Sequence, residues 1–178
     1  SCDMVFALAA EKLGEVEIPE RADYLRVIML ELNRIASHLI WLGTTCLDLG
    51  ALTPFLYAFR EREAILDLFE MTCGQRLTYN YIRVGGVARD IPDEFIPKCR
   101  EFLSTFDAKV DDYEKILTEN PIFIPRNKDV GVLSREMAIA YGVSGPALRA
   151  SGVKFDLRRD DPYSIYDRFK FDIPVTFN

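Results

Sequence analysis

A single carboxylate stands in the most apolar stretch of the chain. Residues 39–59, LIWLGTTCLDLGALTPFLYAF, contain Asp48 as their only charged residue, and His38, the one histidine of the chain, comes directly before them. A carboxylate that is buried without a partner is costly, so it is either neutralised or paired with a cation or a hydrogen-bond donor. Asp48 is therefore the first candidate for proton chemistry.

Spacing places Asp48 on a strip with two other side chains. Ile40, Thr44 and Asp48 follow one another at intervals of four residues, so they share one face if the segment is helical. His38 is a poor partner within the same helix, because a separation of ten residues corresponds to about 15 Å along the axis. Two interpretations stay open from the pattern alone: Asp48 caps the loop at residues 50–53, or it lines a site.

Arginines gather near a predicted break of the chain. Arg76, Arg83 and Arg89 flank aromatic and glycine residues, where a guanidinium group could face a partner subunit or an anionic cofactor. Ordinary surface use fits these arginines as well. The cluster RERE, residues 60–63, is typical of an ion-pair network between helices or of a solvated face.

Composition and cysteine spacing exclude several classes of protein. The chain has 22 basic and 28 acidic residues, a net charge of -6 and no basic patch, so nucleic acid is not an expected partner. No CxxC pair and no histidine near a cysteine is present, so no metal site is expected. The four cysteines, Cys2, Cys46, Cys73 and Cys99, are widely spaced. Cys46 and Cys73 stand among apolar neighbours, which is typical of reduced core residues in an intracellular protein.

Length and hydropathy favour a packed helical core over a membrane span. Of 178 residues, 49% are hydrophobic and 28% are charged, which is sufficient for a core and atypical of disorder. Residues 39–59 are about long enough to cross a bilayer, but they include two glycines, a proline and Asp48. A central aspartate alone costs about 3 kcal/mol on insertion. We therefore expect this stretch to be a helix buried inside protein.

Four long helices are predicted from the spacing of apolar residues. The first runs from Cys2 to Leu13 and the second from about Glu20 to Leu49, with apolar residues at intervals of three and four. Gly50 can end the second helix, Thr53 can cap the third, and Pro54 fits its first position. The third and fourth helices are predicted over about 54–77 and 93–119.

The pattern becomes irregular after the fourth helix. Gly85 and Gly86 indicate a break before it, and Asn120-Pro121 ends it. A short helix is predicted over 134–141, a turn with one helical turn inside over 144–152, and a terminal strand over 167–177.

These elements predict a mainly α fold. We expect an antiparallel helical bundle with long helices over residues 1–120, and an irregular C-terminal part with short strands over 121–178. Both ends of the sequence look cut, at SCDMVF and FDIPVTFN, so the chain is expected to be a single fragment of a larger subunit that lacks both ends.

Several long motifs, in order along the chain, carry a family resemblance. They are ERADYLRVIMLELNRIASHLIWLGTTCLDLGALTPFLYAFREREAILDLFE, GQRL, YIRVGGVARDIP and GVSGPALRASGVKFDLRRDDPYSIYD. Together, from about Ala9 to Pro174, they closely resemble the bacterial counterpart of the mitochondrial 49 kDa subunit of NADH:quinone oxidoreductase, respiratory complex I. Relatives of this family are the large subunits of nickel–iron hydrogenases.

The resemblance implies a part in quinone reduction. Family members pack against the subunit that holds the terminal iron–sulfur cluster and form with it a quinone cavity just above the membrane. Asp48 matches the family's catalytic-site aspartate, which hydrogen-bonds a quinone-binding histidine located before Ser1. Ile40, Thr44 and Phe55 match positions that line the cavity.

The resemblance also implies cofactors, partners and location. Arg83 and, less specifically, Arg76 are expected near the cluster-bearing partner. Quinone is the expected substrate, NADH the electron donor, and the iron–sulfur cluster belongs to a partner subunit, so this fragment binds no cofactor itself. The expected location is the cytoplasmic face of the cell membrane, peripheral to the membrane, with other complex I subunits as partners.

Two departures and two alternatives accompany this interpretation. Thr78 replaces a histidine that mitochondrial members carry, which puts histidine-based protonation near the cluster in doubt, and Val84 replaces a proline. The alternatives are a hydrogenase-type large subunit, which requires CxxC pairs outside these residues, and a purely structural assembly module. The isolated fragment is expected to be inactive and prone to self-association.

Overall fold

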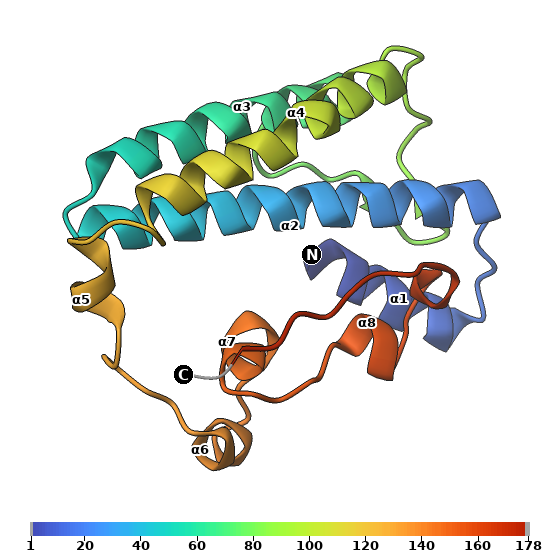
Figure 1. The fold of residues 1–178 in the computed structure, drawn as a ribbon. Coiled ribbons are helices and arrows are strands. Elements are labelled where there is room, and N and C mark those ends of the chain that lie inside the picture. Colours follow the sequence, from blue (N-terminus) through green and yellow to red (C-terminus); the bar gives the residue numbers. More distant parts are fainter. Residues whose placement is uncertain (1, 177–178) are drawn as a thin grey trace. The chain divides into compact units, whose positions relative to one another are not determined.

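A computed structural model describes residues 2–176 of the chain. The chain divides into two compact units, of which the first ends at Ile124 and the second begins at Pro125. The first unit carries the long helices and the second carries short ones (Figure 1).

Long helices dominate the first unit, which confirms the mainly α prediction. They are α1 (Cys2–Gly14), α2 (Glu20–Asp48), α3 (Leu52–Cys73) and α4 (Phe95–Ile116). Only residues 49–51 connect α2 to α3, so the two helices run antiparallel and pack along each other. α4 returns alongside them (Figure 1).

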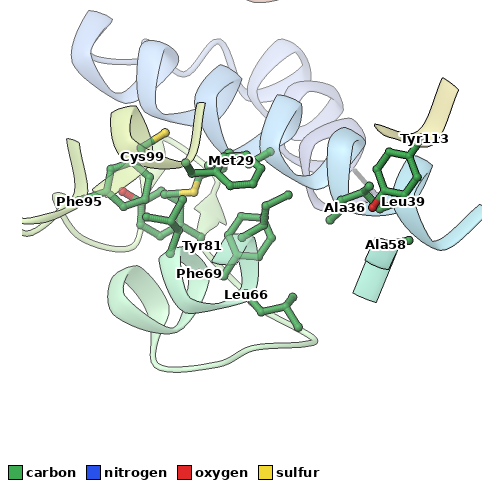
Figure 2. Packing of buried hydrophobic residues seen from close by; sticks show 14 of the residues in the cluster. Met29, Ala36, Leu39, Ala58, Leu66, Phe69, Tyr81, Phe95, Cys99 and Tyr113 are labelled. Carbon is green, nitrogen blue, oxygen red and sulfur yellow. The ribbon is translucent and has the colours of Figure 1, made fainter. Parts of the chain in front are cut away.

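The core is built on one seam of α2. The buried residues of this seam recur at alternating intervals of four and three, which keeps one stripe of the helix facing its neighbours. They are Leu25, Met29, Leu32, Ala36, Leu39, Gly43 and Cys46. Figure 2 shows Met29 beside Phe69, Tyr81, Phe95 and Cys99, which come from α3, α4 and the segment between them.

Gly43 sets the closest approach of α2 to α3. A Cβ atom at this position would lie 3.2 Å from Ala58 Cβ and 3.3 Å from the Cα of Phe55. Because Phe55 contributes a backbone atom to this contact, a larger side chain at position 43 cannot be accommodated by a rotamer change alone. Gly43 therefore fixes how the start of α3 lies against the end of α2.

Two predicted boundaries of α3 are wrong. The helix begins at Leu52, its N-cap is Ala51 without a side-chain hydrogen bond, and so Thr53 and Pro54 lie inside its first turn. It ends at Cys73 instead of near residue 77. Gly74 adopts φ +76°, a left-handed conformation that favours glycine, and its amide closes the helix on the Glu70 carbonyl.

The predicted break at Gly85 and Gly86 is a short hairpin. Its strands are β1 (Ile82–Arg83) and β2 (Gly86–Val87), paired antiparallel with Arg83 opposite Gly86. Two residues per strand are too few for an independently stable hairpin. The stability of this hairpin therefore has to come from contacts with the helices.

A buried ion pair supplies those contacts. Arg26, which is 0% exposed on α2, donates Nη1 and Nη2 to Glu11 of α1 at 3.1 and 2.6 Å. The same guanidinium donates Nε to Gly86 O at 2.9 Å and Nη2 to Arg83 O at 2.6 Å. Glu11 in turn accepts a hydrogen bond from Gly85 N at 2.8 Å. One ion pair thus ties α1, α2 and the hairpin together.

The second unit consists of short helices. They are α5 (Phe123–Asn127), which crosses from the first unit, α6 (Arg135–Ala140), α7 (Gly145–Ala150), α8 (Leu157–Asp160) and the 3₁₀ helix Tyr166–Arg168. Ser134 caps α6 by accepting a hydrogen bond from Met137 N. Asp156, buried in this unit, is paired with Arg149 and Arg158.

The predicted terminal strand is wrong within the described residues. Residues 169–176 contain no strand, although their side chains alternate between partly buried and exposed from Phe171 onward. Phe177, the last residue of the prediction, lies outside the described residues. Within residues 2–176, the only strands are those of the hairpin at 82–87. No helix in the same range has the length and apolarity needed to cross a membrane.

Enlarging Gly43 tests the contact between α2 and α3. We expect Gly43→Val to lower the free energy of unfolding by about 1–3 kcal/mol, because the added atoms must displace Ala58 and the backbone at Phe55. Ser37→Val places the same β-branched side chain on an exposed position of α2 and is the matched control. Equal losses for both variants in thermal or denaturant unfolding would contradict the close-contact explanation.

The buried ion pair predicts a pH-dependent stability. The Arg26 guanidinium, and then the Gly85 amide, hold the pKa of Glu11 below its ordinary value of 4.5. A lowered pKa contributes stability above the unfolded-state value, and this contribution is lost as the pH falls below about 4.5. Glu11→Gln should cost about 3–5 kcal/mol at neutral pH, since it leaves Arg26 buried without a counter-charge.

The difference in stability between the native protein and Glu11→Gln should therefore shrink in acid. Denaturant unfolding of both proteins between pH 7 and pH 3 measures it. A difference that stays constant over this range would show that the charge of Glu11 contributes nothing.

Candidate functional site

The predicted strip lies on the last turns of α2. Thr44 Oγ1 donates to the Ile40 carbonyl at 2.8 Å and approaches the Trp41 carbonyl at 3.2 Å, so its hydroxyl is held against its own helix. Asp48 is the final residue of α2 and is exposed, as is Thr44, while Ile40 is half-buried. The three side chains thus lie together at the surface of the first unit.

The capping interpretation of Asp48 finds no support in the loop that follows. The amides of Leu49, Gly50 and Ala51 donate to the carbonyls of helix α2 at 2.8–3.1 Å. These loop donors are therefore satisfied by the backbone, and the Asp48 carboxylate is not needed for them.

The sequence predicts that this end of α2 is buried inside protein, but several of its apolar side chains are exposed within residues 2–176. Trp41 is 60% exposed and Leu47 is 42% exposed, on α2, while Leu52 and Leu56 near the start of α3 are also exposed. Large exposed apolar side chains close to one turn are typical of surfaces that meet another protein or a ligand. We call Trp41, Leu47, Leu52 and Leu56 the apolar surface of the α2–α3 turn.

Phe55 joins the strip through the close contact at Gly43. Its Cα lies 3.3 Å from the position of a Cβ on Gly43, which directly precedes Thr44. The half-buried ring of Phe55 packs on Phe59 with a centroid distance of 4.5 Å. The structure therefore places Ile40, Thr44 and Asp48 on one strip of α2, and Phe55 of α3 against Gly43, the residue before Thr44.

Arg76 is engaged in a local ion-pair cluster. It pairs with Glu63, Asp67 and Glu70 of α3, which it reaches from just beyond the end of that helix. Hydrogen bonds to these carboxylates and their charges raise the pKa of Arg76, the bond to Asp67 foremost. With three acidic partners already in contact, Arg76 stabilises the C-terminal half of α3.

Arg83 is different, because its terminal nitrogens have no such partner within residues 2–176. Its Nε donates to the Asn80 carbonyl at 3.2 Å. Nη1 and Nη2 make no hydrogen bond within residues 2–176, and the side chain is exposed on the hairpin. Arg83 is therefore the better candidate for contact with a partner.

The structure does not bring Arg83 and Asp48 together. The hairpin is bound to α2 at Arg26, and Asp48 comes 22 residues later on the same helix. At a rise of 1.5 Å per residue, about 33 Å of helix separates the two places. The predicted residues thus form two groups, at opposite ends of α2.

An apolar groove that the sequence did not indicate lies between α2 and α4. Its volume is about 340 Å³, and its α2 side includes Ile35, His38 and Leu42. Leu42 is two residues from Thr44, hence on another side of the helix from the strip. Tyr113 of α4 borders the groove, and burial raises the pKa of its hydroxyl to about 12, so this group stays protonated.

A second cavity belongs to the C-terminal unit. Its volume is about 570 Å³, and both basic and aromatic side chains line it. Arg158 lies 4.7 Å from the ring centre of Phe171 and is bound to Asp156 through Nη2 at 2.8 Å. In the part of the chain that the structure describes, no group of three or more His, Cys, Asp or Glu residues is arranged to hold a metal ion.

Comparison with known proteins identifies a family. Residues 48–178 match the family model described as the 49 Kd subunit of respiratory-chain NADH dehydrogenase. An NADH-quinone oxidoreductase subunit from Clostridium beijerinckii is 53% identical over 173 residues, which is 97% of this chain and 47% of the relative. The Thermus thermophilus protein of the same name is 54% identical, over 97% of this chain and 42% of its own length.

A chloroplast relative extends the same similarity. An NAD(P)H-quinone oxidoreductase subunit from Chlorokybus atmophyticus is 56% identical over 165 residues, covering 93% of this chain and 42% of the relative. The chain thus spans a little under half the length of the relatives it matches.

The two arginines should differ in their effect on stability. Arg76→Ala is expected to lower the free energy of unfolding by about 1 kcal/mol, because three exposed carboxylates lose their shared cation. Arg83→Ala should change it by less than about 0.5 kcal/mol, since this side chain makes one exposed contact. Denaturant unfolding at low and high salt measures both; the reverse order would contradict the assignment of Arg76 as the structural arginine.

Proposed function

Because this chain belongs to the family of the 49 kDa subunit of respiratory-chain NADH dehydrogenase, we propose that it is part of the quinone-reducing module of a proton-pumping NADH:quinone oxidoreductase. In that module it helps to form the quinone cavity next to the subunit that carries the terminal iron–sulfur cluster. The complex holds it at the cytoplasmic face of the membrane, peripheral to the bilayer. The names of the relatives, which are subunits of quinone oxidoreductases, support this proposal.

One observation carries the cavity assignment. Ile40, Thr44 and Asp48 lie on one strip at the end of α2, and Phe55 of α3 packs against Gly43, the residue before Thr44. The Asp48 carboxylate has no role in the backbone of the following loop, and exposed apolar side chains adjoin it. An apolar wall that carries one uncommitted carboxylate suits a ligand that is apolar apart from a few polar groups.

A quinone has this chemistry. Its ring and tail are apolar, its two carbonyl oxygens accept hydrogen bonds, and its reduction to the quinol takes up two electrons and two protons. The electrons would come from the cluster of the partner subunit, after oxidation of NADH elsewhere in the complex. Within this chain, Ile40 and Phe55 would supply apolar contacts. Thr44 would present its methyl group, because its hydroxyl is bound to the carbonyl of its own helix.

Asp48 would act as a positioning residue for the proton donor. A carboxylate beside an imidazole raises the pKa of that imidazole and fixes which ring nitrogen carries the proton. The imidazole would come from a part of the subunit outside these 178 residues, since His38 lies on the side of α2 that faces the groove. Asp48 thereby makes the histidine a better donor to the quinone oxygen.

A structural assembly role is the second candidate. The exposed apolar surface of the α2–α3 turn favours it, because such a surface would be covered in a complex whether or not Asp48 takes part in chemistry. Under both proposals the 178-residue chain alone is expected to be inactive.

Replacing Asp48 by asparagine separates the two candidates. Asp48→Asn in the full-length subunit of the assembled complex should slow NADH-driven quinone reduction by roughly tenfold or more, because positioned proton transfer contributes on the order of 10²–10⁴-fold. Oxidation of NADH by an artificial acceptor that bypasses the quinone site should keep its rate. Both rates are measured on purified complex.

Asp107→Asn is the matched control. Asp107 is an exposed aspartate of α4, a helix that carries none of the four residues assigned to the cavity, and its replacement should leave both rates unchanged. Unchanged quinone reduction in a fully assembled Asp48→Asn complex would overturn the proposed role and favour the assembly module.

A further inference from the structure

The β1–β2 hairpin is held by side chains that bind the backbone of its turn. Arg26 donates to the carbonyls of Arg83 and Gly86, the pair that closes the turn, at 2.6 and 2.9 Å. Glu11 accepts from the amide of Gly85, inside the turn, at 2.8 Å. The backbone on both sides of Val84 is thus fixed from the interior of the first unit.

Holding two short strands through a buried ion pair carries a large desolvation penalty. Arg26 is completely buried and Glu11 is 5% exposed. Because charges lose their hydration on burial, apolar residues of the same size in place of a buried ion pair often give equal or greater stability. The pair is satisfied only because the turn provides two carbonyls and one amide in the right places. What the pair gains over an apolar contact is a single position for the hairpin.

The outer side of the hairpin presents two groups in that position. Val84 is 48% exposed, and the exposed Arg83 has two terminal nitrogens that make no hydrogen bond within residues 2–176. A guanidinium fork beside an exposed apolar side chain fits a carboxylate on a protein surface, which it can bind through two parallel hydrogen bonds. The tip is thus chemically suited to an acidic spot on a neighbouring subunit.

We infer that Glu11 and Arg26 are positioning residues, which fix the hairpin so that Arg83 and Val84 dock a neighbouring subunit through an exposed carboxylate. The inference rests on the proposed function in one respect, that the chain works inside a multi-subunit complex. It concerns the end of α2 remote from Asp48, and so it does not depend on the chemistry of the quinone.

A double-mutant cycle in the assembled complex tests the inference. The rate at which the full-length subunit is released from its neighbours is measured at several salt concentrations for the native complex, Arg26→Lys, Arg83→Ala and the double variant. Arg83→Ala should release the subunit roughly tenfold faster and make release less dependent on salt, since an interfacial charge contact is lost.

Arg26→Lys keeps the charge but loses the fork that reaches Glu11 and both carbonyls together. It should also speed release by several-fold, and this effect should disappear in the Arg83→Ala background, because a misplaced hairpin matters only through Arg83. Equal effects of Arg26→Lys in both backgrounds, or unchanged release in Arg83→Ala, would overturn the inference.

Glu61→Gln is the matched control for loss of a buried charge contact. Glu61 of α3 is 1% exposed and pairs with Arg60 of the same helix and with Lys109 of α4. Its replacement should lower stability, while its effect on release stays the same with and without Arg83. If Arg26→Lys prevents assembly, Glu11→Gln takes its place in the cycle, since its amide oxygen still accepts from Gly85 N.

The failure of this inference can be told apart from failure of the proposed function. Loss of quinone reduction in Asp48→Asn together with additive effects of Arg26→Lys and Arg83→Ala would leave the function standing and remove the positioning role. Unchanged quinone reduction in Asp48→Asn, together with non-additive effects of Arg26→Lys and Arg83→Ala, would remove the proposed role of Asp48 and leave the positioning role standing.

Discussion

The first unit depends on one satisfied charge in its interior. Arg26 can be buried because Glu11 balances its charge and because two carbonyls of the hairpin accept hydrogen bonds from its Nε and Nη2. Removing any of these partners leaves a charged group unpaired in a low-dielectric environment, which is far costlier than losing an ordinary surface contact. The docking of α1, the start of α2 and the hairpin are therefore linked, and none of the three positions is set by its own secondary structure alone.

A second constraint, of shape instead of charge, operates at the other end of α2. Gly43 lets α3 approach so closely that the backbone of Phe55 lies against α2 directly before Thr44. Between these ends, the buried seam of α2 packs continuously. The helix thus holds the strip and the hairpin at a fixed separation, and the two groups have no need of direct contact.

Much of this could be predicted from the sequence, and the failures have physical causes. The intervals of three and four locate α2 and α4 because each of them buries one apolar stripe. The predicted helix at the start of the chain also forms, but α1 buries Met4, Ala7 and Glu11 and leaves Leu13 exposed. The same intervals misplace the end of α3 because the apolar spacing continues past Gly74, whose left-handed backbone stops the helix. The hairpin escapes prediction because its position is set by Arg26, sixty residues away. The predicted terminal strand does not form in residues 169–176, although Thr176 N donates a hydrogen bond to the Arg149 carbonyl. For the site, spacing indicates the strip, but only the contacts of Arg76 distinguish that residue from Arg83.

The Glu11–Arg26 pair also has a consequence for the order of events in the cell. Its members and the backbone groups that satisfy them come from three segments that are separate along the chain, so the pair is complete only after all three have docked. A nascent or damaged chain in which α1 has not yet packed would display a loose, misdirected tip. If the hairpin docks a neighbouring subunit as inferred, assembly would select those chains whose first unit has finished folding.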